Sequence, residues 1–244
     1  MALIVRALAA TYYDGHDIEA HSHDWGQLIY ASSGIMRVRA AGRLWIVPPA
    51  RALWAPAGLR HEIHARGDFA MRTIYLAPGT MEALPDECRA IDVTPLLREL
   101  LLHIVAIQLL DEADPRHRAW ATVLIERLAA AETLPLSLPL PADARAARAA
   151  DLLQADPGGE IELAALAARS GASLRTLQRL FLAETGLRIS EWRQRLRLIH
   201  AAGLLGAGGG VTGAGLAVGY GSTSAFIAAF RRQFGRTPAR MRAR

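Results

Sequence analysis

The chain has 244 residues, a hydrophobic fraction of 52% and a formal net charge of +5. This length suffices for one or two domains with a real core. Cys88 is the only cysteine, which excludes an intrachain disulfide and fits a reducing compartment. The first residues lack a signal-peptide pattern, and the apolar segment 100–110 is too short and interrupted to span a bilayer, so we expect a cytoplasmic protein with no membrane partner.

The excess of positive over negative charge lies in the carboxyl-terminal part of the chain. Residues 1–141 contain 13 Arg and 16 Asp or Glu, whereas residues 142–244 contain 15 Arg and seven Asp or Glu. Such a local surplus of cations is what neutralisation of a phosphate backbone requires. Every basic side chain is Arg rather than Lys, for which a bias in genome composition is a simpler explanation than bidentate binding.

The first 76 residues have the pattern of short β-strands. Apolar stretches alternate with turns rich in Gly and Pro, and no helical pattern lies between them. The strands are expected at residues 27–31, 34–40, 43–49, 51–56, 60–65 and 69–76. Such a series favours an antiparallel sandwich or barrel, which we assign to residues 1–92.

A helical period follows over residues 93–133, where leucine and isoleucine recur at helical spacing and Pro115 stands near the start of a second segment. This predicts a helical hairpin whose apolar faces pack on the barrel or pair two subunits in a homodimer. Three spaced prolines favour extended backbone, so residues 134–142 are assigned as a linker. Residues 143–244 are expected to be all helical, which gives an α+β fold with several domains.

Residues 163–236 contain two similar blocks, each with a helix pattern, a glycine turn and a second helix pattern. The turns contain Gly171 and Gly219, and a serine then opens the second helix. A helix-turn-helix unit places its second helix in the major groove of DNA, so two units predict a protein that reads two groove segments. To do so from one face, the two helices must match segments about 34 Å apart, one turn of duplex.

The first block carries side chains suited to base edges. Arg175 and Gln178 share one side of the predicted helix, and Arg pairs with guanine and Gln with adenine in the major groove. A solvated arginine face on an ordinary helix is the plainer interpretation, but the second block and the charge asymmetry favour DNA binding. The predicted DNA contacts of this block are Ser173, Leu174, Arg175, Gln178 and Arg179.

The second block is predicted to position the DNA backbone rather than to discriminate bases. Phe226, Phe230 and Phe234 recur every four residues and form the side expected to be buried. The opposite side carries small hydroxyl and apolar groups, which suit a thymine methyl group or a phosphate. The predicted contacts here are Thr223, Ser224, Ile227, Arg231 and Arg232.

Several motifs of the carboxyl-terminal part resemble the DNA-binding domain of the AraC/XylS family of bacterial transcription regulators: RTLQRLF, ISEWRQRLRL, AVGYGSTSAFIAAFRRQFG and TPARMR. The resemblance covers about residues 145–242 and implies a transcription regulator, not an enzyme. Gly213 and Gly215 depart from the family pattern, which has better helix formers there. Because each Gly costs about 1 kcal/mol relative to Ala inside a helix, we expect the second unit to be loosely folded until DNA binds.

Two groups of residues in the amino-terminal part resemble the two signatures of cupin barrels. The first group is Gly15, His21, His23, Gln27 and Gly34, and the second is Pro56, Gly58 and His61. The resemblance implies that three histidines meet inside a barrel. His21 and His23 are expected to point the same way from one strand, and neutral imidazoles with an open position suit Zn, Ni or Fe. Gln27 replaces the carboxylate of the pattern, and a neutral amide is a weaker ligand.

Two interpretations of this group stay open. A divalent metal is held by His21, His23, Gln27 and His61, or a metal-free pocket uses the histidines to bind a ligand or each other. Core packing is the commoner role of the nearby aromatic residues, but some of them could line a pocket for a small-molecule effector. The predicted pocket residues are Trp25, Gln27, Tyr30, Trp45, Trp54 and His61.

The preferred function is a sequence-specific regulator that binds double-stranded DNA and responds to a small-molecule effector in the barrel. One alternative is a cupin metalloenzyme, such as a dioxygenase or isomerase, with a nucleic-acid-binding tail. The missing carboxylate argues against it. Another is a nonspecific architectural DNA protein, against which Arg175 and Gln178 argue. Activation and repression are both compatible with the sequence.

Overall fold

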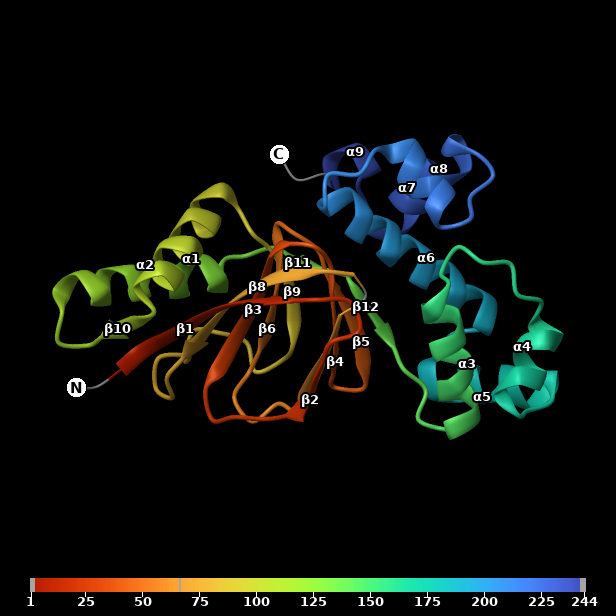
Figure 1. The fold of residues 1–244 in the computed structure, drawn as a ribbon, viewed down its shortest axis with the longest axis horizontal. Coiled ribbons are helices and arrows are strands. Elements are labelled where there is room, and N and C mark those ends of the chain that lie inside the picture. Colours follow the sequence, from red (N-terminus) through yellow and green to blue (C-terminus); the bar gives the residue numbers. More distant parts are fainter. Residues whose placement is uncertain (1–2, 66, 242–244) are drawn as a thin grey trace. The chain divides into compact units, whose positions relative to one another are not determined.

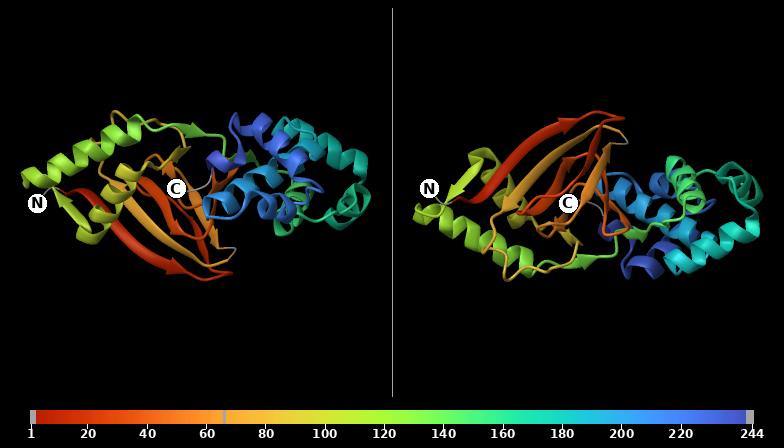
Figure 2. Two further views of the ribbon diagram at one scale, coloured as in Figure 1. Left: turned by 90° about the horizontal axis from the view of Figure 1, so that it is seen from above. Right: turned by 90° about the horizontal axis from the view of Figure 1, so that it is seen from below.

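The structure is a computed structural model that describes residues 3–65 and 67–241. The chain forms two compact units. The first contains the residues up to Ala41 and Trp45–Leu136, and the second contains Gly42–Leu44 and the residues from Ser137 onward. The first unit combines β-sheets with a pair of helices, whereas the second is mainly helical (Figures 1 and 2).

Antiparallel strands form a seven-stranded sheet and a five-stranded sheet. The order of the first is β10-β1-β8-β3-β6-β9-β11, and its strands are β1 (Leu3–Tyr12), β3 (Gly26–Ser33), β6 (Arg51–Ala55), β8 (Phe69–Leu76), β9 (Arg89–Asp92), β10 (Leu109–Asp111) and β11 (Thr133–Leu134). The order of the second is β12-β5-β4-β7-β2, and its strands are β2 (Asp17–His21), β4 (Met36–Ala40), β5 (Arg43–Val47), β7 (His61–Ala65) and β12 (Ser137–Pro139). The six strands predicted from the sequence are found as β3 to β8. The proline-rich segment after residue 133, expected to be extended, contributes the short strands β11 and β12.

The predicted helical hairpin consists of α1 (Pro95–Ile107) and α2 (Pro115–Ala129). Each helix begins at a proline that follows a capping residue: the side chain of Thr94 accepts a hydrogen bond from the Leu97 amide, and that of Asp114 from the Arg116 amide. The buried faces of both helices pack on one face of the seven-stranded sheet. Members of this core are Leu28, Tyr30, Trp54, Ile74, Leu97, Leu101, Ile104, Leu124 and Leu128.

Because side chains alternate along a strand, the residues between those core positions face the other side of the sheet. Leu28 and Tyr30 of β3 pack toward the helices, whereas Gln27 of β3 hydrogen-bonds to Thr73 and Tyr75 of β8 on the opposite face. That opposite face carries the polar residues of the site described below. Within residues 3–65 and 67–241, no helix is both long and apolar enough to cross a membrane.

The second unit is arranged around one long helix. Its helices are α3 (Ala144–Ala155), α4 (Leu163–Ser170), α5 (Leu174–Thr185), α6 (Ile189–Gly206), α7 (Val211–Ala217), α8 (Thr223–Phe234) and α9 (Pro238–Met241). Trp192 of α6 is fully buried, its ring lies 5.6 Å from that of Phe181, and its indole donates a hydrogen bond to the Pro139 carbonyl at 2.7 Å. The indole thus ties α6 both to α5 and to the segment before α3.

Candidate functional site

The first helix-turn-helix unit consists of α4, a turn at Gly171 and α5. Gly171 ends α4 with φ +75°, a left-handed conformation that residues with a Cβ rarely adopt. Ser173 then caps α5, its hydroxyl accepting a hydrogen bond from the Thr176 amide at 3.2 Å. Leu177 and Phe181 are buried, so the opposite side of α5 is the one left for a partner.

That opposite side of α5 carries the residues predicted to contact DNA. All five are exposed: Ser173, Leu174, Arg175, Gln178 and Arg179. Among the residues that the structure describes, no acidic side chain forms an ion pair with Arg175 or Arg179. Two guanidinium groups and an amide are therefore presented together on a rigid, capped helix, which is the geometry that direct reading of bases uses.

The second helix-turn-helix unit consists of α7, a turn at Gly219 and α8. Ser222 caps α8 by accepting a hydrogen bond from the Ala225 amide at 3.2 Å. Phe226, Phe230 and Phe234 are buried as expected, with successive ring centroids 5.5 and 4.5 Å apart. Of the predicted contacts, Thr223 is half-buried, whereas Ser224, Ile227, Arg231 and Arg232 are exposed.

The two glycines of α7 differ in their surroundings. A Cβ on Gly215 would lie 3.0 Å from the ring of Phe226, which is tighter than most real contacts, so close packing of α7 on α8 favours Gly here. A Cβ on Gly213 would meet nothing within 4 Å. Gly215 therefore has a packing reason that the sequence did not reveal, whereas the cost in helix propensity at Gly213 has no compensating contact.

Two arginines of α6 hold the loop that precedes α4. Arg197 donates hydrogen bonds to the carbonyls of Pro157, Gly158 and Gly159 at 3.0, 3.2 and 2.9 Å. Arg193 donates to the carbonyls of Gly159 and, at 2.9 Å, Ile161. Burial, reinforced by the charge of Arg197, lowers the pKa of Arg193 from its ordinary value. The loop is thereby fixed to α6.

The loop at residues 157–159 also contacts the turn of the second helix-turn-helix unit. A Cβ on Gly219 would lie 2.6 Å from the Gly158 carbonyl oxygen and 3.0 Å from Arg197, and Gly219 itself has φ +80°. Only glycine fits a position with both constraints. Arg197, the loop at Gly158 and Gly219 form a three-way contact that links the two helix-turn-helix units directly.

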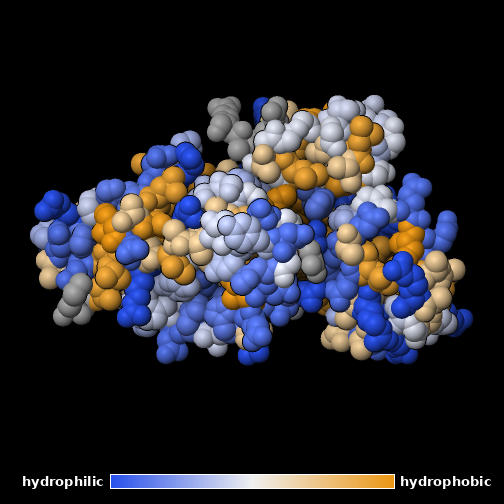
Figure 3. Space-filling view, viewed as in Figure 1, coloured by the Kyte–Doolittle hydropathy of each residue, from blue (hydrophilic) through white to orange (hydrophobic). Residues whose placement is uncertain are grey.

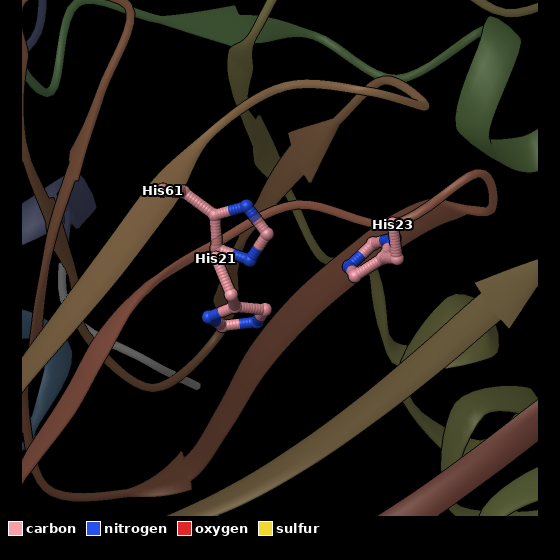
Figure 4. A group of neighbouring side chains, drawn as sticks. All are labelled: His21, His23 and His61. Carbon is pink, nitrogen blue, oxygen red and sulfur yellow. The ribbon is translucent and has the colours of Figure 1, made fainter.

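Three histidines of the first unit, His21, His23 and His61, meet near the end of β2. His21 of β2 and His61 of β7 are partners in the antiparallel pair, with ring centroids 4.5 Å apart. His23 lies two residues beyond the end of β2, so the expectation that His21 and His23 project from one strand is wrong, although the ring of His23 still meets those of His21 and His61. One ligand atom from each histidine lies within 4.8 Å of the others (Figure 4).

The Nδ1 atom of each of these three rings already has a hydrogen-bond partner. In each case Nδ1 lies within hydrogen-bond distance of a backbone carbonyl, which can only accept, so Nδ1 carries a proton; in the neutral ring Nε2 then keeps its lone pair. The distances are 2.8 Å from His21 to Glu19, 2.6 Å from His23 to Trp25 and 2.9 Å from His61 to Leu59. Histidines that ligate a metal through Nε2 are oriented in this way by an outer carbonyl.

Gln27 shows what the Nε2 atom of His23 faces. The Thr73 hydroxyl donates to the Leu28 carbonyl at 3.1 Å and therefore accepts from the Gln27 amide nitrogen at 2.9 Å. This directs the Gln27 carbonyl oxygen toward His23 Nε2, 3.1 Å away. When the His23 ring is neutral, two lone pairs face each other, and either a metal ion between them or a proton on Nε2 would stabilise the arrangement.

His61 supports the same conclusion. Its side chain is 1% exposed, and its Nε2 is a buried atom without a hydrogen-bond partner. Burial lowers the pKa of His61, which favours the neutral ring that ligates metals. The residues therefore fit a divalent metal ion: His21, His23 and His61 would hold it through Nε2, with the Gln27 oxygen as a further neutral ligand. Such an ion would supply open coordination positions for a bound molecule.

A pocket of about 500 Å³ opens beside this histidine site. We call it the barrel pocket; it is lined by Arg6, Ala7, Leu8, His23, Trp25, Tyr75, Gln108 and Leu109. The guanidinium of Arg6 lies 4.6 Å from the ring centre of Trp25, a cation–π arrangement. Burial raises the pKa of Tyr75. This volume is in the range that small-molecule ligands occupy.

The residues predicted for an effector pocket fall into two groups. Trp25 lines the barrel pocket, and Gln27 and His61 belong to the adjoining histidine site. Tyr30, Trp45 and Trp54 are buried elsewhere, with indole groups that donate to the carbonyls of Ala40 and Pro85. Tyr30 lies three positions after Gln27 and thus on the other face of β3, which strand alternation could have indicated. Arg6 and Tyr75 were not predicted.

Two family matches cover most of the chain. The AraC-like ligand binding domain family matches residues 4–138, and the helix-turn-helix domain family matches residues 166–244. The HTH-type transcriptional regulator NimR of Escherichia coli (strain K12) is 33% identical over 227 residues, which are 92% of this chain and 82% of NimR. The chain belongs to the AraC family of helix-turn-helix regulators. It is thus a DNA-binding transcription regulator with a ligand-binding domain of cupin-like fold, and not an enzyme.

Further comparisons found similarities that cover less of the chain or have low identity. The HTH-type transcriptional regulator RipA of Corynebacterium glutamicum is 41% identical over 100 residues, which are 41% of this chain and 30% of RipA. A solved AraC-type regulator from Chromobacterium violaceum has 30% identity over 40% of this chain and 88% of its own, with a TM-score of 0.39. The structure of fatty-acid-bound ToxT from Vibrio cholerae has 11% identity, covers 98% of this chain and 94% of its own, and also has a TM-score of 0.39.

Proposed function

We propose that this regulator recognises a specific sequence of double-stranded DNA and that a small molecule bound in the first unit controls it. The observation that carries the proposal is the exposed side of α5, where Arg175 and Gln178 project from a capped helix without acidic partners among the described residues. These side chains would discriminate bases, whereas Arg231 and Arg232 of α8 would contact phosphates. The predicted contacts Ser173, Leu174, Arg179, Thr223, Ser224 and Ile227 complete the interface.

Control by an effector requires unequal binding to two states of the protein. A ligand that bound the DNA-competent and the incompetent arrangement equally would shift nothing. The barrel pocket and the histidine site are the places in the first unit where such a ligand would bind. We propose that residues 1–92 form the sensor, residues 93–133 the helical hairpin, residues 134–142 the linker and residues 143–244 the DNA-binding part. A regulator of this kind acts in the cytoplasm, where the DNA is.

Selection of bound sequences from a random DNA library, followed by footprinting, tests the proposal. We expect one enriched motif with two segments separated by about one helical turn. Enrichment of no motif, or protection of all sequences alike, would contradict it in favour of an architectural protein. The genes beside the enriched motif then provide candidate effectors.

The hairpin of the first unit is the proposed surface for a homodimer. Leu96 of α1 is 60% exposed and Val123 of α2 is 40% exposed, and Figure 3 shows hydrophobic residues gathered over these helices. Exposed apolar side chains on neighbouring helices suit an interface between copies. Analytical ultracentrifugation should give a dimer that the double variant Leu96→Glu, Val123→Glu converts to monomer. A monomeric wild-type protein would contradict this assignment.

We also propose that the histidine site binds a divalent metal such as Zn, Ni or Fe. The support is the unpartnered Nε2 of His61 together with the three Nδ1–carbonyl contacts. Metal analysis of untagged protein should show about one ion per chain, and the variant His61→Ala should lose it. An ion content far below stoichiometry, even after incubation with each metal and desalting, would leave a metal-free pocket as the answer.

A further inference from the structure

One row of the seven-stranded sheet connects the histidine site to the barrel pocket. Tyr75 of β8 lies directly opposite Arg6 of β1 on one side and opposite Gln27 of β3 on the other. Directly opposed residues of antiparallel strands project from the same face. Arg6, Tyr75 and Gln27 therefore form a continuous row across three strands, and Gln27 ends that row at His23.

From this row we infer the chemical class of the effector: a small anion with oxygen donors and an apolar body, which completes the coordination of the metal while its charge faces Arg6. The inference rests on the regulator function and the metal site proposed above. It specifies which molecules the barrel pocket selects.

The charges of the site favour an anion. The proposed ligands, three imidazoles and one amide, are all neutral, so the protein compensates neither positive charge of a divalent ion. Arg6 adds a further positive charge to the pocket wall, and no acidic side chain among the described residues forms an ion pair with it. Positive charge in a partly enclosed site is best balanced by a bound anion.

The remaining walls require an apolar body. Ala7, Leu8 and Leu109 line the pocket beside the ring of Trp25, so a strongly hydrated anion such as phosphate would leave apolar surface uncovered. A flat ring or short aliphatic chain that bears a carboxylate or phenolate covers these side chains and presents its oxygens to the metal. Oxygen donors of this kind are ordinary ligands of such ions.

Tyr75 supplies a specific donor for the anion. The Gln27 amide nitrogen donates to the Tyr75 hydroxyl at 3.1 Å, so the phenolic oxygen accepts there, and its own proton is left to donate either to the nearby Thr73 hydroxyl or to a ligand. Because Tyr75 also lines the barrel pocket, this proton can be donated to an oxygen of the bound anion. The contact distinguishes an oxygen anion from an apolar cation or a neutral hydrocarbon.

The test uses full-length protein loaded with Co(II), whose visible absorption reports its coordination. Benzoate, salicylate and catechol serve as anionic or ionisable probes, and benzyl alcohol is the neutral control. At least one probe should change the Co(II) spectrum in a saturable way, and benzyl alcohol should not. Arg6→Gln should retain the cobalt spectrum of the free protein but raise the Kd of that probe about tenfold, as loss of one charge-assisted contact implies.

Arg98→Gln is the matched control, because Arg98 is exposed on α1 and does not line the pocket. It should leave both the spectrum and the Kd unchanged. A cobalt spectrum that none of the three probes alters, or an Arg6→Gln variant that binds the probe as wild-type does, would overturn the inference. Neither result would affect DNA selection by the same protein, and failure of that selection is what would remove the regulator function itself.

Discussion

The two helix-turn-helix units have the same scaffold but present different chemistry. Both second helices begin at a serine whose hydroxyl accepts an amide hydrogen bond at 3.2 Å, and both bury a row of large apolar residues. The exposed side of α5 carries Arg175 and Gln178, whereas that of α8 carries Ser224 and Ile227 before its arginines. Because the buried rows set the fold and the exposed rows set the partner, two units of the same fold can present different side chains to a partner.

We expect the largest effect on stability at the contact between the two helix-turn-helix units. Arg197→Ala removes three hydrogen bonds to the carbonyls of the loop at 157–159, and we expect it to lower the free energy of unfolding by about 2–4 kcal/mol. Arg195→Ala, an exposed position on the same helix, is the control and should change it by less than about 0.5 kcal/mol. Urea denaturation measures both. Equal changes in the two variants would show that Arg197 does not fix the loop.

Arg175→Ala tests the difference between the two exposed rows. We expect a loss of about 1–3 kcal/mol of discrimination at one base pair, because the bidentate contact of a guanidinium with guanine is lost. Ser224→Ala, at an exposed position of α8, should leave base preferences unchanged. Binding titrations against single-base variants of the selected motif provide the measurement. If Ser224→Ala relaxes a preference as strongly as Arg175→Ala, both units discriminate bases.

Arg232→Ala addresses the role proposed for α8. Loss of one phosphate contact should weaken binding to all sequences alike and reduce the slope of log K against log salt by about one. Fluorescence anisotropy at several salt concentrations measures the slope. A variant with an unchanged slope, or with weaker binding to only one sequence, would place Arg232 outside the phosphate contacts.

The smallest effect is expected within α7. Gly213→Ala should stabilise the second helix-turn-helix unit by up to about 1 kcal/mol, since a Cβ there meets no other atom within 4 Å and Ala favours a helix. Gly215→Ala should instead destabilise, because its Cβ would crowd the ring of Phe226. Thermal unfolding of the two variants compares them. If both stabilise, the close packing of α7 on α8 is not limiting.

The sequence predicted the helical carboxyl-terminal unit in more detail than the β-sheet unit that precedes it. Its caps, turns and buried rows are local patterns, and Phe226, Phe230 and Phe234 are buried where their spacing indicated. The barrel pocket depends on pairing between distant strands. Arg6 and Tyr75 are 69 positions apart and become neighbours only through the register of β1 with β8, which no local pattern encodes.

Within the first unit, some outcomes were accessible to local reasoning and others were not. The odd spacing between Gln27 and Tyr30 already placed them on opposite faces of one strand. The end of β2 at His21 was not accessible, because a two-residue spacing cannot reveal whether His23 continues the strand. The missing carboxylate was read from Gln27 directly, but its hydrogen bond to Thr73, which orients the amide, again required the fold.

The packing of Gly219 against the Gly158 carbonyl has a consequence for the operator. If α5 and α8 cannot rotate independently, they can bind only two groove segments that have one fixed rotation about the duplex axis relative to each other. Insertion of a single base pair between the two halves of the operator turns one half by about 34–36° around the duplex axis, since a turn contains about 10–10.5 base pairs. The two helices cannot follow that rotation, so the protein should not bind such operators even though every contacted base is intact.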